Sequence, residues 1–180
     1  MTDQNPATEP GVVPSTDPKD VEKVRSLMEK VDIAMVTTID ATSTDGRLTS
    51  RPLSTQLAEE DGDALFLVRR TSAFARDVSA DPRVNVAYSS MKAWVSVGGT
   101  AQIIDDRALV NSLWSKGADM FMDGGPENPD NIVVKVSADT ASLWGGESLI
   151  GTAVKMVKSV ASRSDENGQD QGGPTVVQLP

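Results

Sequence analysis

Residues 47–78 read RLTSRPLSTQLAEEDGDALFLVRRTSAFARDV, and this stretch decides the expected fold. Its pattern predicts a strand, a hairpin turn at residues 61–63, a buried strand over residues 64–68 and a helix that begins at Ser72. A Ser or Thr in front of a helical run offers a side-chain oxygen to the first free N–H groups of the helix. Because short connections can join only antiparallel strands, the sheet built from this hairpin is expected to be antiparallel.

The same stretch is basic, although the whole chain has a formal net charge of -9. After Arg47 at its start, it contains four more arginines close together, Arg51, Arg69, Arg70 and Arg76. A helix start attracts anions, and a guanidinium group is a forked donor that suits phosphate oxygens. The pattern therefore predicts a cofactor anchored by its phosphate. The alternative is that these arginines pair with nearby carboxylates, namely those of Glu59, Glu60, Asp61, Asp63 and Asp77.

Composition excludes several reaction classes. The chain has 180 residues, enough for one domain, and contains neither cysteine nor histidine. Zinc hydrolases and enzymes with Ser–His–Asp or Cys–His sites are therefore largely excluded. If the protein is an enzyme, its chemistry is expected to belong to a bound organic cofactor. The sequence assigns no catalytic residue and no metal site.

The sequence also bears on partners and location. The acidic balance argues against a nucleic-acid partner, because such a partner needs a basic face. No apolar run is long enough to cross a membrane, and the N-terminus lacks a signal-peptide pattern. A cytoplasmic protein that meets a small-molecule reductant or substrate is therefore expected.

The periodicity along the chain predicts three regions. They are a disordered tail over residues 1–16, one domain over residues 17–161 and a flexible tail over residues 162–180. Within the last region, residues 175–179 are apolar enough to dock, at a place that the sequence does not specify. Expected helices cover residues 17–31, 72–80, 105–116 and 151–161. Expected strands cover residues 33–39, 47–58, 64–68, 83–89, 93–104 and 132–136, the last continuing over 141–144 after a polar break.

These elements predict a mainly β fold with flanking helices. About six antiparallel strands, joined largely by hairpins, can close into a small barrel that leaves no open edge. Gly98 and Gly99 interrupt one long strand and indicate a bulge or the close approach of another group. Trp114 lies on an apolar helical face and is expected in the core.

Several blocks of the sequence, in this order and spacing, resemble the pyridoxamine 5'-phosphate oxidase-like family. They are AMVTT at residues 34–38, DGR at 45–47, SRPL at 50–53, DPRVNVAY at 81–88 and VSVGGTA at 95–101. Within the family, the chain is most similar to the general stress protein 26 branch, whose Gly-Gly-Pro loop and late tryptophan resemble residues 124–126 and Trp144. The resemblance covers roughly residues 21–161.

The resemblance implies a split barrel that binds FMN and works as a homodimer, with flavin in grooves at the subunit interface. It places Arg51 and Ser72 at the FMN phosphate. The ring edge is assigned to the backbone of residues Pro52, Leu53, Ser54 and Thr55. Trp94 stands near the ring, although it could equally be a packing residue on a barrel strand, and Trp144 is assigned to the dimer groove.

Two positions depart from the family pattern. Relatives commonly have Thr at the position of Val68 and Lys at the position of Phe74, and both side chains help to hold the cofactor. The loss of the lysine weakens FMN binding unless Arg69, Arg70 or Arg76 replaces it. The family also has members that bind a deazaflavin, heme or a pigment, and members with little or no flavin, so FAD, a deazaflavin or no cofactor stays an alternative to FMN.

Three functions follow from these observations. The first is an FMN-dependent oxidoreductase of the general stress type. The second is a non-enzymatic protein that binds a flavin or a related ligand. The third is a split barrel that has lost its cofactor. Val68 and Phe74 favour the second and third.

Overall fold

The computed structural model of this protein describes residues 17–57, 63–145 and 175–178. Within them the helices are α1 (Pro18–Met28), α2 (Ala73–Ala80), α3 (Arg107–Leu113) and α4 (Lys116–Phe121). The strands are β1 (Ile33–Ile39), β2 (Leu48–Ser54), β3 (Gln56–Leu57), β4 (Ala64–Arg69), β5 (Arg83–Ser89), β6 (Ala93–Ile104), β7 (Asn131–Gly145) and β8 (Thr175–Gln178). The predicted class, mainly β with flanking helices, is confirmed.

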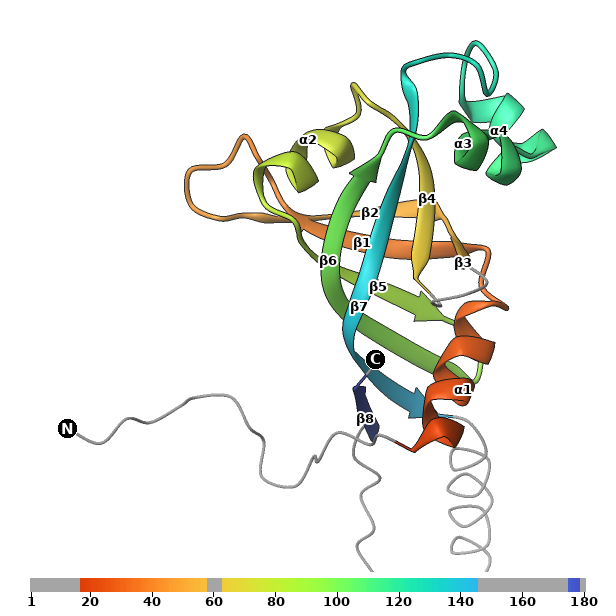
Figure 1. Cartoon of the computed structure of the whole chain (residues 1–180). Helices are drawn as coiled ribbons and strands as arrows, with labels where there is room; N and C mark the ends of the chain where they lie inside the picture. Colours follow the sequence, from red (N-terminus) through yellow and green to blue (C-terminus); the bar gives the residue numbers. More distant parts are fainter. Residues whose placement is uncertain (1–16, 58–62, 146–174, 179–180) are drawn as a thin grey trace, which may run out of the picture.

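The strands form one antiparallel sheet in the order β2-β1-β5-β6-β7-β4-β3, with β8 paired to β7. The first and last strands of this order, β2 and β3, are separated in the chain by Thr55 alone. The sheet must therefore curl until its two ends meet, and Figure 1 shows β1 and β2 crossing behind β6 and β7. This curled sheet is the split barrel that the sequence predicts.

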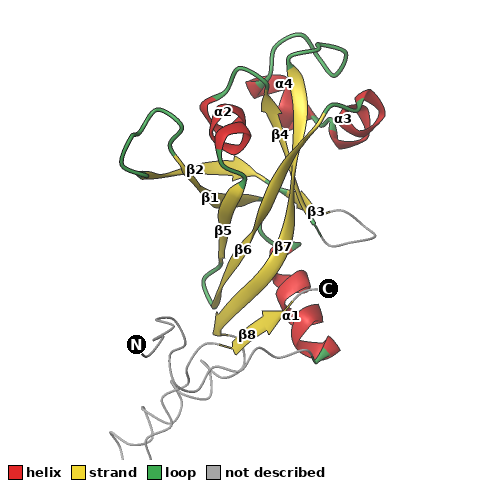
Figure 2. Cartoon of the chain, turned by 60° about the vertical axis from the view of Figure 1, so that its left-hand side comes forward, coloured by secondary structure: helices red, strands yellow, loops and turns green. Residues whose placement is uncertain are grey.

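The core lies on the inner face of the curled sheet. Burial alternates along β1 and β5, so that Ala34, Val36 and Val86 point inward while their neighbours point outward. Helices α1 and α2 lie at opposite ends of the sheet (Figures 1 and 2). They close the core with Val24 and Met28 from α1 and with Phe74, Ala75 and Val78 from α2.

Two of the helices begin where their capping residues predict. The carboxylate of Asp17 accepts a hydrogen bond from the backbone of Lys19, and Pro18 takes the first helical position of α1. The hydroxyl of Ser72 accepts one from the N–H of Ala75 at the start of α2. The helices expected at residues 17–31 and 72–80 are thus confirmed, although α1 ends at Met28, three residues earlier than expected.

The strand count differs from the expected six, because the described residues form eight. Thr55 breaks the expected second strand into β2 and β3, since its N–H bonds to the carbonyl of Asp32 instead of a ladder partner. β8 is the other addition. The two segments expected at residues 132–136 and 141–144 form one strand, β7, because β6 pairs along its length and a bulge absorbs the irregularity.

The bulge lies where the two glycines predict it. The register between β6 and β7 shifts between Gly98 and Gly99. A Cβ on Gly99 would lie 2.2 Å from the carbonyl oxygen of Ser137, so only glycine fits there without movement of the backbone. The sequence therefore located this irregularity and its cause correctly.

The helix expected over residues 105–116 ends earlier, at Leu113, and α4 follows as a separate helix capped by Ser115. Residues 175–178 fall within the predicted flexible tail but form β8, since β7 offers them a free edge beyond β4. The tail over residues 1–16 and the helix at 151–161 lie outside the described residues. In the described part of the chain, no helix has the length and apolar character needed to span a membrane.

Candidate cofactor site

Arg51, the expected phosphate anchor, is tied to other side chains inside the barrel. One terminal nitrogen of its guanidinium lies 2.7 Å from Oδ2 of Asp77, and the other lies 2.9 Å from Oγ1 of Thr38. Thr38 in turn donates to Oδ2 of Asp77 at 2.9 Å. β1, β2 and α2 therefore each contribute one member of a closed polar triad, which we call the Arg51 triad.

Asp77 is the buried member of this triad, with an exposed fraction of 1%. Its other oxygen, Oδ1, accepts the backbone N–H of Ala41 at 3.0 Å. Burial pushes the pKa of Asp77 up, but the hydrogen bonds from Ala41, Arg51 and Thr38 outweigh burial and hold the pKa below its usual range. Asp77 is therefore ionised at neutral pH and forms a buried salt bridge with Arg51.

Phe74 and Val68 are core residues. Phe74 is 2% exposed, and its ring meets that of Phe66 edge-on with the centroids 6.1 Å apart. The guanidinium carbon of Arg51 lies 5.6 Å from the Phe74 ring centroid, so this ring also covers part of the cation. Phe74 therefore fills the core at the position where the family pattern has a lysine, and its contact with a cofactor stays a prediction. Val68 is buried as well and packs in the same cluster.

The start of α2 lies next to two more of the expected cations. Arg69 pairs with Asp123, and Arg70 pairs with Asp105 at 2.5 Å. The two side chains reach different aspartates, as expected for adjacent residues at the end of a strand. Arg76 is exposed on α2, where its charge acts on Asp40. The alternative, in which the arginines pair with nearby carboxylates, thus names the right partner for Arg51. Arg69 and Arg70 also pair with carboxylates, but with Asp123 and Asp105, which it did not name.

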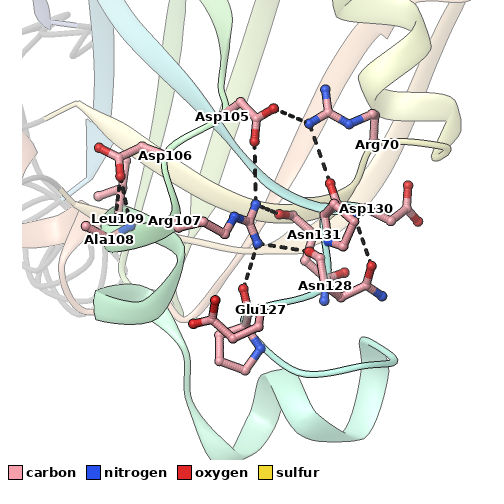
Figure 3. Close-up of polar contacts among 12 residues, drawn as sticks. Arg70, Asp105, Asp106, Arg107, Ala108, Leu109, Glu127, Asn128, Asp130 and Asn131 are labelled. Carbon is pink, nitrogen blue, oxygen red and sulfur yellow. Dashed lines mark hydrogen bonds and ion pairs between the residues drawn. The ribbon is translucent and has the colours of Figure 1, made fainter.

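The acidic partners of Arg69 and Arg70 are Asp123 and Asp105, which the sequence did not indicate as partners. Figure 3 shows Arg70 and Arg107 on either side of Asp105, at the end of β6. Arg107 also donates to the carbonyl oxygens of Pro126 and Asn128, at 2.6 and 2.9 Å, and to that of Asn131. The loop over residues 123–131 is therefore wrapped around one guanidinium group.

Asn131 fixes the other side of this loop. Its amide nitrogen donates to the carbonyl oxygens of Asp123 and Gly125, at 3.1 and 2.8 Å. Its Oδ1 is buried and, among the residues that the structure describes, has no hydrogen-bond partner. The run of Gly, Pro, Asn and Asp in the sequence indicated a loop but not its partner, because Arg107 lies 19 to 24 residues earlier.

The remaining predicted site residues lie on both faces of the sheet. Pro52, Ser54, Trp94 and Trp144 are exposed on its outer face, whereas Arg51 and Leu53 point inward. Thr55 is buried, and its hydroxyl lies 3.4 Å from that of Tyr88. Burial raises the pKa of Tyr88 to about 12. The structure therefore brings Arg51 and Phe74 together, but places the two tryptophans on the opposite face.

The outer face carries exposed apolar side chains. Trp94 and Trp144 are cross-strand neighbours, and their exposed fractions are 47% and 39%. Among the outward-facing residues of β1, β2 and β5, Arg83 alone is charged. We define the outer face by its large apolar residues, Ile33, Met35, Leu48, Trp94 and Trp144, and by the small polar residues Ser50, Ser96 and Ser142 between them. Trp114 is not part of it, because it packs half-buried against the smaller apolar cluster beside α3.

A small cleft of about 190 Å³ lies between the end of α1 and β3. Thr55 is the only predicted site residue that lines this cleft. The other lining residues are the apolar Met28, Val31 and Leu57 and the polar Arg25, Glu29, Asp32 and Gln56. Its volume is below the roughly 300 Å³ at which ligand pockets usually begin. Among the described residues, no group of three or more His, Cys, Asp or Glu side chains could hold a metal ion.

The residues of this chain suit the ring of the implied flavin, FMN, but not its phosphate. The outer face offers exposed aromatic rings beside small side chains, as the planar ring of a flavin requires. The phosphate of FMN needs an excess of cationic donors, yet Arg51, Arg69 and Arg70 each face an aspartate. These three paired arginines therefore do not form the phosphate site that the family pattern implies.

The curled antiparallel sheet with a helix at each end defines a split-barrel protein. The chain belongs to the pyridoxamine 5'-phosphate oxidase-like family, whose model matches residues 19–167. The predicted family is thus confirmed.

Known proteins share part of this sequence or its fold. Protein bli-3 of Neurospora crassa is 33% identical over 132 residues, which are 67% of this chain and 62% of that protein. Hence the chain spans less than two thirds of this curated relative. The structure of general stress protein 26 from Bacillus anthracis has a TM-score of 0.60 at 21% identity, covering 68% of this chain and 91% of its own. The structure of a heme-binding protein from Mycobacterium smegmatis has a TM-score of 0.56 at 19% identity. The match covers 75% of this chain and 56% of the Mycobacterium smegmatis chain.

Proposed function

We propose that this protein is a homodimeric flavin-binding member of its family, with FMN as the flavin and oxidoreductase activity as its function. The observation that carries the proposal is the outer face, an exposed apolar surface on a family scaffold, centred on the Trp94–Trp144 pair. A bound flavin supplies one- and two-electron chemistry by itself, so the protein needs only to bind and orient it. This accords with a sequence that has no histidine or cysteine.

The homodimer is part of the proposal because a second copy is the occupant that this surface suits. The face is large and nearly uncharged, although 24% of all residues are charged. Its central positions are small, with Ala87 opposite Ser96 and Ser96 opposite Ser142, so two sheets can approach closely. Exposed apolar patches of this kind mark association sites. The two tryptophans would then line the margin of a groove between the two copies.

The described residues provide no evident proton donor on the outer face. Its hydroxyl groups are those of serine and threonine, and the hydroxyls of Thr37 and Ser50 are hydrogen-bonded to each other at 2.8 Å. The protein's own part in the chemistry is therefore to place the flavin ring against aromatic side chains and to limit its contact with water. A small-molecule reductant or substrate would approach the exposed side of the ring, and a cytoplasmic location belongs to the same proposal.

The test is to purify the full chain, record its absorption spectrum and identify any released ligand by mass. We expect a dimer by light scattering, flavin absorbance, and bleaching of that absorbance by NADPH or NADH. If the protein contains flavin but neither donor reduces it, the result would favour the alternative of a non-enzymatic flavin-binding protein. A colourless protein that cannot be loaded with a flavin would contradict the proposal and favour a barrel without cofactor.

The cofactor-free alternative has one specific observation in its favour. Phe74 and Val68 fill the core at positions where the family pattern has cofactor-binding side chains. Heme, as in the Mycobacterium smegmatis protein, would need an axial ligand other than histidine or cysteine in this chain. A Soret band in place of flavin bands would identify that case.

A further inference from the structure

We infer that Asp77 is a specificity-determining residue that neutralises Arg51 from within, so that this protein binds riboflavin about as tightly as FMN. The inference rests on the proposed flavin binding and concerns one part of it, the recognition of the phosphate. It departs from the role that the family pattern gives to Arg51.

The first step is the geometry of the Arg51 triad. The two terminal nitrogens of Arg51 already donate to Asp77 and Thr38 at 2.7 and 2.9 Å. The ring of Phe74 covers the cation, and the Arg51 side chain is 20% exposed. A phosphate would therefore have to displace Asp77 or share the cation with it. Displacement would leave a buried carboxylate without its partner, which is strongly unfavourable.

The second step is the local charge. A phosphate monoester carries about two negative charges at neutral pH. Asp77 cancels the charge of Arg51, and the neighbouring cations Arg69 and Arg70 face Asp123 and Asp105. Asp130 adds a further carboxylate at the same end of the barrel, hydrogen-bonded to the hydroxyl of Thr71 at 3.1 Å. These three arginines therefore leave no excess positive charge for a dianion, and the charge of the fourth, Arg76, acts on Asp40.

The third step is the fit between Asp77 and its surroundings. Asp77 lies on the face of α2 that also carries Phe74 and Val78, the face that packs into the core. A carboxylate on an apolar helix face needs a cation, and Ala41 and Thr38 supply further donors. The donor set around Asp77 is thus complete, and Arg51 is required there rather than at a ligand.

The main experiment compares the affinities of riboflavin and FMN for the full chain by fluorescence titration. For the wild-type protein we expect dissociation constants within about threefold of each other, whereas a charge-assisted phosphate contact corresponds to about tenfold or more. Asp77→Asn releases Arg51, and we expect it to raise the affinity for FMN about tenfold without changing that for riboflavin. The matched control is Asp20→Asn, which breaks the ion pair with Lys23 on α1, at the opposite end of the sheet from α2, and should leave the ratio of the affinities near one.

A wild-type protein that binds FMN about tenfold or more tightly than riboflavin would overturn the inference, and this arm needs no variant. An unchanged affinity ratio in a folded Asp77→Asn variant would also overturn it. If the wild type binds neither flavin, the proposed function fails, and inorganic phosphate still tests the inference. At constant ionic strength, phosphate in place of chloride should leave the melting temperature of the wild type unchanged and raise that of Asp77→Asn. If phosphate raises the melting temperature of the wild type, and the Arg51→Lys substitution abolishes that increase, our inference is contradicted.

Discussion

Trp94 on β6 and Trp144 on β7 are direct partners across an antiparallel strand pair, and both rings are exposed on the outer face of the sheet. A cross-strand aromatic pair stabilises a sheet through mutual contact, but it does not need to stay in water for that purpose. Two large exposed rings at the same place indicate that something covers them. In the proposed homodimer, the second copy does.

The dimer is tested by a charge on the outer face. Met35→Asp places a carboxylate on a side chain that is 43% exposed on β1, so the fold should persist while the interface is lost. We expect the dissociation constant of the dimer to rise at least about 100-fold, or about 2.7 kcal/mol, by sedimentation velocity. Met120→Asp is the control, because Met120 is 80% exposed on α4 and lies outside the outer face. Equal behaviour of the two variants would refute the interface.

Asp77 makes the free energy of unfolding depend on pH in the acidic range. Its pKa in the folded protein is held below its ordinary value, so the unfolded chain takes up the proton first as the pH falls. The contribution of Asp77 is fully present above about pH 4 and is lost as the pH falls through its folded pKa. Asp77→Asn should cost about 3 kcal/mol at neutral pH, because it leaves Arg51 without its charge partner. Urea unfolding at pH 7 and at pH 3 should show a smaller difference between variant and wild type at pH 3.

Tyr88 makes the free energy of unfolding depend on pH in the alkaline range. Burial raises the pKa of its hydroxyl to about 12, whereas the unfolded value is near 10.0. Below pH 10 its contribution is complete, and it is lost as the pH rises towards the folded pKa, by about 1.4 kcal/mol per unit. Tyr88→Phe should flatten this alkaline decline in the free energy of unfolding. A decline of the same slope in the variant would show that other groups cause it.

The two glycines of the bulge should differ in tolerance. Gly99→Ala brings a methyl group 2.2 Å from the carbonyl oxygen of Ser137, so the backbone must shift, at a cost of about 1–3 kcal/mol. Gly98→Ala meets only Oγ1 of Thr140 at 3.1 Å, a side-chain atom that can move. Thermal unfolding of both variants should therefore show the larger loss for Gly99→Ala, and the reverse order would contradict this account of the bulge.

The loop over residues 123–131 should depend on Arg107. Lysine at this position keeps the charge but lacks the planar fork that reaches three carbonyl oxygens. We expect Arg107→Lys to increase amide hydrogen exchange in this loop at least about tenfold, with β1 and β5 unchanged. The control, Arg83→Lys, alters an exposed arginine that pairs with Asp81 two residues away. If the loop keeps its protection in Arg107→Lys, the guanidinium group is not what holds it.

Much of the fold could be read from local patterns. Alternation along β1 and β5, the capping residues Asp17 and Ser72, and the Gly98–Gly99 bulge each depend on neighbours close in the chain, and the structure agrees with all of them. The break at Thr55 and the end of α3 at Leu113 were missed, because contacts with distant segments decide both. The family followed from the order of several short blocks, none of which is specific alone.

By itself, the sequence determined the mainly β class, most of the elements in the described residues, the lack of histidine and cysteine, and a cluster of arginines beside a helix start. Only the tertiary structure decided what those arginines face. Asp77 lies 26 residues from Arg51, Asp123 lies 54 from Arg69, and Asp105 lies 35 from Arg70. The free energy of a cation depends on the charges around it in space, and no local pattern specifies which distant carboxylate the curled sheet brings within hydrogen-bonding distance.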